Sequence, residues 1–427
     1  MKALILDGSQ PNDPTSAKIK TSLQSQLPNV ETLVLCEQKI GNCAGDFFCW
    51  VRSPGMCNTN DDNRIIAEKI MQSDLVSYLT PVTFGGYSSA LKRMVDHQIQ
   101  NISPFFATID GEIHHQPRYQ NYPDVLTIGW MDQPNAQSEA VFSQLVHRNA
   151  INMYASTSVT GLVNYEANLD DQIRGWLDEI KSASSSPIPA LSKTEISSAD
   201  AAPIRRAVLL VGSPRTKKST SASLGGYLMG QVNARGVETE TLQIYTSFSS
   251  AERTRLTLEK LDQADLIVLA FPLYVDSLPA PVIAALEKIA AHRASVKVAQ
   301  SFAAIANCGF PEAKHNDTAL AICEQFANEA EMKWLGSLAL GGGEGLVHGV
   351  PLNEMDGRAI PLKKSLELSA ASLALGMSIP QEARDLLASS IIPNWLYKMF
   401  GGFGWKQAAK QYGTVKSVHA QPYRRVE

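Results

Sequence analysis

The chain has 427 residues, a length that fits two or three domains better than one. Hydrophobic residues make up 44% of it and charged residues 19%, so the chain can bury large cores and falls outside the disordered class. The formal net charge is −4, and without a basic excess to neutralise phosphates a dedicated nucleic-acid-binding protein is not expected.

The first half of the chain alternates short β-rich runs with helical patterns. Strands are predicted over 3–6, 31–35, 75–81, 125–130 and 152–157, and helices over 16–27, 63–72, 89–100, 137–150 and 170–181. Apolar strands that alternate with helices predict a parallel sheet with helices on both faces, because right-handed crossovers place helices on each side. The first half is therefore predicted to be a doubly wound α/β domain, residues 1–182.

A Ser/Ala/Pro-rich stretch over 183–203 lacks periodicity and is predicted to be a linker. The alternation then resumes, with strands predicted over 207–211, 238–244, 266–272, 301–307 and 334–340. A second α/β domain is therefore predicted over 204–427. It would end in an aromatic-rich extension, from Trp395 to Trp405, that we expect to pack on the second domain or on a partner subunit.

The two halves match each other in detail. Gly8-Ser9 after the first strand corresponds to Gly212-Ser213, and the seven-residue spacing from Asp74 to Pro81 recurs from Asp265 to Pro272. These repeated intervals indicate a tandem duplication. The first copy is longer between these landmarks, which we assign to a cysteine-bearing loop over 43–57.

Ligands of open α/β sheets bind beyond the carboxyl ends of the strands, so the loops there carry the functional prediction. In the second half the first such loop, Gly212–Ser221, gathers hydroxyls and backbone N–H groups at the start of a helix, as phosphate binding requires. The alternative is a polar turn capped by Ser219. A later loop offers the ring of Tyr274 to a flat heteroaromatic group, although a rim or dimer contact is also open. The glycine-rich run Gly341–Gly345 predicts a flexible connection.

With these loops the sequence resembles the flavodoxin-like NAD(P)H-dependent FMN reductases and the related iron-sulfur flavoproteins. The resemblance covers both halves and rests on the Gly-Ser-Pro-Arg loop and the Pro-Leu-Tyr segment. It implies two tandem flavodoxin-like domains, each with a five-stranded parallel sheet ordered 2-1-3-4-5, and it implies FMN as cofactor with NAD(P)H as co-substrate. In the second half the implied FMN-binding residues are Ser213, Arg215, Ser219, Thr220, Ser221, Pro272, Leu273, Tyr274, Val275, Asn307 and Gly309.

The first half fits the FMN pattern less evenly. Its corresponding residues are Ser9, Thr15, Ser16, Pro81, Val82, Thr83 and Phe84. Its phosphate loop has no arginine, and Asp13 stands near the place of a dianion, where like charge would weaken binding. We therefore rank the second half as the FMN site and the first as a degenerate copy.

The cysteine loop resembles the C-x-x-C-x-x-C insertion of the iron-sulfur relatives, but Asp46 replaces one cysteine. Only Cys43, Cys49 and Cys57 remain in register, so a 4Fe-4S cluster would need Asp46, Cys36 or another chain to complete it. The loop has no histidine, so zinc is no better supported. We assign no metal and expect an ordered loop whose thiols pack or reversibly pair.

The resulting hypothesis is an FMN-dependent NAD(P)H oxidoreductase that passes hydride to flavin and then to a quinone, free flavin or another small acceptor. Because the flavin supplies the chemistry, no catalytic side chain is named. The alternatives are an FMN electron carrier reduced by a protein partner, and a scaffold that has lost flavin. The two copies are expected to form an intrachain pseudo-dimer in which the Cys49-Trp50 loop shields the second flavin, and further self-association stays open. No apolar run is long enough for a signal peptide or a membrane span, so a cytoplasmic protein is expected.

Overall fold

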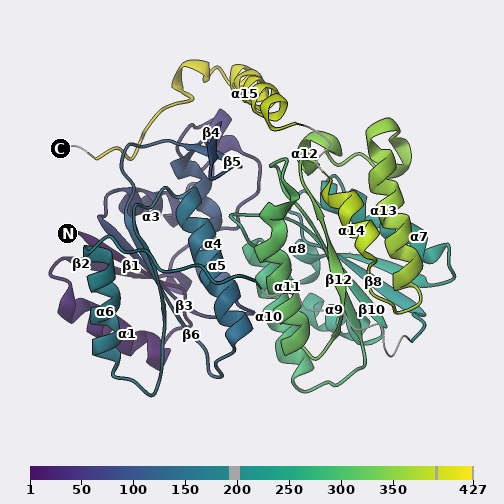
Figure 1. The fold of residues 1–427 in the computed structure, drawn as a ribbon, viewed down its shortest axis with the longest axis horizontal. Coiled ribbons are helices and arrows are strands. Elements are labelled where there is room, and N and C mark those ends of the chain that lie inside the picture. Colours follow the sequence, from purple (N-terminus) through teal and green to yellow (C-terminus); the bar gives the residue numbers. More distant parts are fainter. Residues whose placement is uncertain (192–201, 390–392, 426–427) are drawn as a thin grey trace. The chain divides into compact units, whose positions relative to one another are not determined.

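The fold is described from a computed structural model that covers residues 1–191, 202–389 and 393–425 (Figure 1). It divides into two compact units, Met1–Leu191 with Trp395–Glu427, and Ser192–Asn394. Each unit is built on one parallel five-stranded sheet. Of the predicted linker, residues 192–201 lie outside the described part of the chain, so the domain limits there stay a prediction.

The first unit has the strand order β2-β1-β3-β6-β7. Its strands are β1 (Ala3–Asp7), β2 (Val30–Val34), β3 (Leu75–Pro81), β6 (Asp124–Trp130) and β7 (Ser158–Leu162). Its helices are α1 (Pro14–Gln26), α2 (Phe48–Val51), α3 (Asp62–Met71), α4 (Ser89–Asp96), α5 (Ala136–Asn152) and α6 (Leu169–Lys181). Ile19 of α1 and Leu177 of α6 share one buried cluster with Ile5 and Leu79, so these two helices cover the same face of the sheet.

Three details of the first unit differ from the sequence prediction. The strand predicted over 152–157 is wrong, because α5 continues to Asn152 and a turn through Tyr154, at φ 53°, delays the strand to β7. Helix α4 ends at Asp96 and continues as a 3-10 helix, His97–Asn101. An antiparallel hairpin, β4 (Ile102–Ile109) and β5 (Glu112–Pro117), was not predicted.

The second unit repeats the same order, with β9-β8-β10-β11-β12 across its sheet. Its strands are β8 (Arg206–Val211), β9 (Glu238–Gln243), β10 (Leu266–Pro272), β11 (Ser301–Asn307) and β12 (Lys333–Leu340). Its helices are α7 (Thr220–Asn233), α8 (Ile244–Ser247), α9 (Ala251–Asp262), α10 (Ala280–Arg293), α11 (Asp317–Glu329), α12 (Gly343–Leu346), α13 (Ile360–Leu373) and α14 (Gln381–Ala388). Both sheets thus have the predicted 2-1-3-4-5 order.

Backbone hydrogen bonds at equivalent positions show that the two units share the same local backbone structure. The N–H of Gly8 donates to the carbonyl of Leu79 at 2.8 Å, and the N–H of Gly212 donates to that of Ala270 at 2.8 Å. A substituent on Gly8 would lie 2.5 Å from a side-chain atom of α4. Glycine at this position therefore lets the first loop pass close to α4.

The C-terminal segment belongs to the first unit, which corrects the expectation that it packs on the second domain or on a partner. The indole rings of Trp405, on α15 (Asn394–Gln411), and Trp50 lie 5.1 Å apart. The Arg118 guanidinium donates to the carbonyls of Val418 at 3.1 Å and Ala420 at 2.8 Å. The apolar rings of the first copy's cysteine loop and a buried arginine therefore hold this segment. No helix in the described residues is long and apolar enough to cross a membrane.

Candidate functional site

Three loops meet at the carboxyl edge of the second sheet, as predicted. The side-chain amide of Asn307, at the end of β11, donates to Ser221 Oγ at 2.8 Å and to the carbonyl of Phe271 at 3.0 Å. Asn307 is buried, so it ties the loops after β8, β10 and β11 into one surface. A buried amide with two such bonds fixes the relative position of these loops.

The hydroxyl-rich loop after β8 turns most of its hydroxyls inward. Ser219 caps α7, because its Oγ accepts from the N–H of Ala222 at 3.1 Å. The same hydroxyl donates to the carbonyl of Thr216 at 2.7 Å, and Thr220 Oγ1 donates to the carbonyl of Gly343 at 3.2 Å. The capped-turn alternative is therefore present in the structure. Ser213, also buried, accepts the N–H of Arg215 at 3.4 Å.

Arg215 is held by an acidic side chain that the sequence analysis did not single out. Its guanidinium lies 2.5 Å from Glu344 Oε1, and both side chains are partly exposed. Glu344 comes from the glycine-rich run after β12, which was expected to be a flexible connection. Here that run is packed, since a substituent on Gly341 would lie 2.2 Å from the carbonyl oxygen of Pro311. The one sequence signal for this contact is that Glu344 is an acidic residue in a loop that follows a strand of the same sheet.

The loop after β10 makes a tight turn at the same edge. The N–H of Tyr274 donates to the carbonyl of Ser277 at 2.9 Å, and the return bond measures 3.1 Å. Val275 and Asp276, between them, have φ values of 43° and 56°. Positive φ at both central residues is the type I′ geometry, which is unfavourable for a β-branched valine. Leu273, just before the turn, donates its N–H to the carbonyl of Asn307 at 2.8 Å.

The other predicted residues of this edge lie in the same three loops. Pro272 is the last residue of β10, and Gly309 is exposed in the loop that follows β11.

The first copy repeats the backbone of this edge. The N–H of Val82 donates to the carbonyl of Trp130 at 2.9 Å, and Thr83 pairs with Gly86 across a turn in which Phe84 has a φ of 54°. Pro81 ends β3, in the same way as its counterpart ends β10.

The first copy differs in charge, because β1 ends in a carboxylate. Asp7 is fully buried and accepts from Ser16 Oγ at 2.7 Å, from Lys20 Nζ at 2.6 Å and from the N–H of Ser9 at 2.9 Å. Burial raises the pKa of Asp7, but the bonds from Lys20, Ser9 and Ser16 outweigh it and hold the pKa below its ordinary value. Asp13 caps α1, accepting from the N–H of Ser16 at 2.8 Å. The N–H of Ser9 and the hydroxyl of Ser16 therefore already have Asp7 as their acceptor.

The charged side chains at the two phosphate loops differ in sign. Residue 211 is the counterpart of Asp7, and it is an uncharged valine in the second copy. The second loop instead carries Arg215 and the exposed Lys217 and Lys218. A dianion is favoured near cations and disfavoured near carboxylates, so the second loop suits a phosphate monoester better than the first, where Thr15 stands half-exposed beside Asp13.

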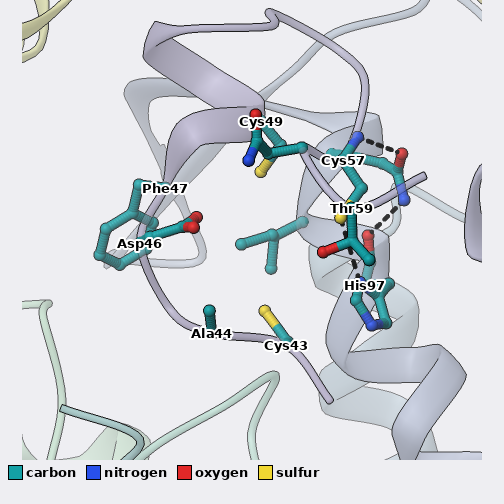
Figure 2. A pocket seen from close by; sticks show the side chains of 11 residues that line it. Cys43, Ala44, Asp46, Phe47, Cys49, Cys57, Thr59 and His97 are labelled. Carbon is teal, nitrogen blue, oxygen red and sulfur yellow. Dashed lines mark hydrogen bonds between the residues drawn. The ribbon is translucent and has the colours of Figure 1, made fainter. Parts of the chain in front are cut away.

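The cysteine loop of the first unit lines a small pocket of about 20 Å³, with room for a water-sized group and too small for a flavin. The lining residues are Cys43, Ala44, Asp46, Phe47, Cys49, Cys57, Asn58, Thr59, His97, Ile99 and Gln100 (Figure 2). His97 was not singled out from the sequence, because it falls at the end of a predicted helix. Within residues 1–191, 202–389 and 393–425, no group of three His, Cys, Asp or Glu side chains is placed to hold a metal ion.

Comparison with known families gives two matches along the chain. The model of the family described as NADPH-dependent FMN reductase matches residues 1–111 and again residues 205–310, together just over half of the chain. The two matches begin at the first strand of each unit. A search of curated proteins gave no match.

Three similar solved structures each align with about two fifths of the chain. An FMN-dependent NADH-azoreductase from Bacillus anthracis, in complex with FMN, has 12% identity and a TM-score of 0.30, covering 40% of this chain and 99% of its own. A putative quinone reductase from Klebsiella pneumoniae has 15% identity and a TM-score of 0.30, covering 41% and 87%. An NAD(P)H:quinone oxidoreductase from Methanothermobacter marburgensis has 12% identity and a TM-score of 0.29, covering 40% and 95%.

Proposed function

Because the chain belongs to the NADPH-dependent FMN reductase family, and is thus an NAD(P)H-dependent FMN oxidoreductase, we propose that its electrons pass on to a quinone, free flavin or another small acceptor. FMN supplies the redox chemistry, since its ring accepts hydride from a reduced nicotinamide. The protein's task is then to bind and orient the cofactor. This explains why the sequence offers no acid-base side chain for the reaction.

We place the FMN site in the second unit. The observation that carries this assignment is the charge of its first loop, which contains Arg215 and two lysines, whereas the corresponding part of the first copy contains the buried carboxylate of Asp7. A phosphate there would lie at the start of α7, which begins at Thr220 after its cap Ser219. Backbone N–H groups of the first helical turn have no partner within the helix and could donate to the phosphate. The type I′ turn from Tyr274 to Ser277 would border the isoalloxazine ring.

The contact between Arg215 and Glu344 has a direct consequence for binding. A phosphate that reaches the guanidinium nitrogen bonded to Glu344 competes with that carboxylate, because both anions would accept from the same N–H group of Arg215. Since this ion pair is partly exposed, its replacement costs little, on the order of 1 kcal/mol or less. Glu344 therefore lowers the affinity for FMN without preventing binding.

The test is an anaerobic titration of the purified chain. The protein is saturated with FMN, desalted, and analysed for flavin per chain by absorption. NADPH and then NADH are added next. Rapid bleaching of the bound flavin supports a reductase, whereas bleaching with dithionite alone would make the chain an electron carrier. A chain that retains no flavin at all would contradict the proposed site.

Several expectations stay predictions. These are the acceptor, the choice between NADH and NADPH, the intrachain pseudo-dimer, further self-association of the chain and the cytoplasmic location. The proposed FMN site does not depend on any of them.

A further inference from the structure

The pocket of the first unit contains a cysteine and a histidine in contact. Cys57 Sγ lies 3.6 Å from Nδ1 of His97, and Nε2 of the same ring lies 2.9 Å from the carbonyl oxygen of Gly41. A carbonyl can only accept, so Nε2 carries a proton. In the neutral ring Nδ1 is then the acceptor that faces the Cys57 thiol. This is the arrangement of a nucleophile, a base and a group that orients the base.

The surroundings favour transfer of the proton from the thiol to the ring. Burial lowers the pKa of His97, but the bonds with Cys57 and the Gly41 carbonyl outweigh it and raise this pKa above its ordinary value. Burial raises the pKa of Cys57, but the bond and charge of His97 outweigh it and bring this pKa below its ordinary value. Both directions favour a thiolate beside an imidazolium.

Charged and titratable groups face this pair from every neighbouring element. Asp96 on α4 and Asp61 before α3 act on His97, and Asp96 is itself paired with the buried Lys92. Arg64 of α3 donates to the Cys57 carbonyl at 2.7 Å. The remaining titratable groups around the pair are Cys43, Cys49, Asp46 and Tyr423. The carboxylates of Asp96 and Asp61 stabilise the charged form of the ring.

Two more thiols line the same pocket. Figure 2 shows Cys43 and Cys49 around the space that Cys57 also borders. Burial raises the pKa of Cys43 to about 12 and raises that of Cys49 further, so both are protonated at neutral pH. Cys43 and Cys57 are partly exposed, and the rim residues Asp46 and Thr59 are exposed. A small molecule in solution can therefore reach Cys57, and Cys57 reacts first because the other two thiols stay protonated.

We propose that Cys57 is a nucleophilic thiol, with His97 as its base, that exchanges with small disulfides and is resolved by a second thiol of the same pocket. The Cys57 thiolate attacks one sulfur of the disulfide, a Cys57–sulfur bond forms, the substrate S–S bond breaks, and the departing thiolate takes the proton from His97. Cys43 or Cys49 then gives its proton to the now neutral His97 and attacks the Cys57 sulfur. The bond between Cys57 and the substrate sulfur breaks, and the second small thiolate takes the proton from His97 and leaves. Two protein thiols are oxidised while one disulfide is reduced to two thiols.

The first test is alkylation of the full chain with iodoacetamide between pH 5 and 9, with each cysteine followed by peptide mass spectrometry. Cys36 is the internal control, because it is exposed and its pKa is raised. At pH 7 we expect Cys57 to react about fivefold to tenfold faster than Cys36, since an ordinary thiol is only a few per cent ionised there and nucleophilicity falls with pKa. Cys57 should also lose reactivity at a lower pH than Cys36.

His97→Gln can still donate to the Gly41 carbonyl but offers no base. It should move the Cys57 profile to higher pH and remove most of the rate advantage. Equal rates and equal pH profiles for Cys57 and Cys36 in the unmodified chain would overturn the proposal, even if the variant failed to fold.

The second test uses glutathione disulfide and intact mass. The chain should lose two hydrogens and release two glutathione molecules, with Cys57 mapped to the new internal disulfide. Cys57→Ser should abolish this reaction. Adducts confined to Cys36, or an internal disulfide without Cys57, would refute the assignment. Neither readout involves flavin, so the outcome is independent of the proposed reductase function.

Discussion

Replacement of Arg215 by alanine tests the position of the FMN phosphate. A hydrogen bond between a guanidinium and a phosphate contributes about 1.5–3 kcal/mol, and about 1.4 kcal/mol corresponds to a factor of ten, so Arg215→Ala should raise the Kd for FMN roughly 10- to 100-fold. The loss of the Glu344 contact offsets this, but by less than about 1 kcal/mol, because that ion pair is partly exposed. FMN fluorescence quenching gives the Kd directly.

Glu344→Gln should have the opposite effect. Because it removes the competing carboxylate, we expect FMN to bind up to about fivefold tighter, corresponding to on the order of 1 kcal/mol. In the double variant this gain should largely disappear, since Arg215 is then absent and the two substitutions are not additive. Arg205→Ala is the matched control, because that side chain is 88% exposed and directly precedes β8, at the end of the strand away from the Arg215 loop. An unchanged Kd for Arg215→Ala, or an equal loss for Arg205→Ala, would refute the proposed phosphate site.

Two further predictions concern stability. Gly8→Ala should destabilise the chain by about 1–3 kcal/mol in urea unfolding, because the new methyl group would clash with α4. Gly226→Ala is the control and should be neutral or stabilising, because the space beside Gly226 on α7 is open. Equal effects of the two substitutions would contradict the packing argument. Lys20→Met should destabilise by about 1–3 kcal/mol at pH 7 by leaving the buried Asp7 carboxylate without its cation, while exposed Lys18→Met should not. The lowered pKa of Asp7 stabilises the unmodified chain above the pKa of the unfolded carboxyl, and this stability is lost as pH falls through the folded pKa. The difference caused by Lys20→Met should therefore shrink below pH 3.8, the ordinary pKa of an aspartate carboxyl. A difference that is constant with pH would argue against this account.

The sheets were predictable because their strands are nearly continuous apolar runs between turn signals. Strands such as Leu266–Pro272 are buried on both faces, and their pattern does not depend on distant residues. The misplaced strand at 152–157 shows the limit of this reasoning. Met153 and Ala150 are apolar and buried, and such residues fit the end of a buried helix as well as a buried strand. The sequence pattern therefore does not show that α5 continues to Asn152 and that the strand begins later.

The candidate site was predictable only where topology alone brings loops together. The rule for sheet edges placed the loops after β8, β10 and β11 at one edge, and the hydrogen bond from Asn307 to Ser221 shows that two of them meet there. Glu344 could not be linked to Arg215, which lies 129 positions earlier, because no local pattern encodes their pairing. His97 escaped notice for the same reason, since its partner Cys57 lies 40 positions away on another segment.

The return of residues 395–425 to the first unit makes the second unit an insertion within the first. During synthesis on the ribosome, the second unit can complete its sheet while the first unit still lacks the C-terminal segment that contacts Arg118 and Trp50. A premature stop after residue 394 would therefore damage the copy encoded first and spare the copy encoded last. Full maturation of the amino-terminal half has to wait until residues 395–425 have been synthesised.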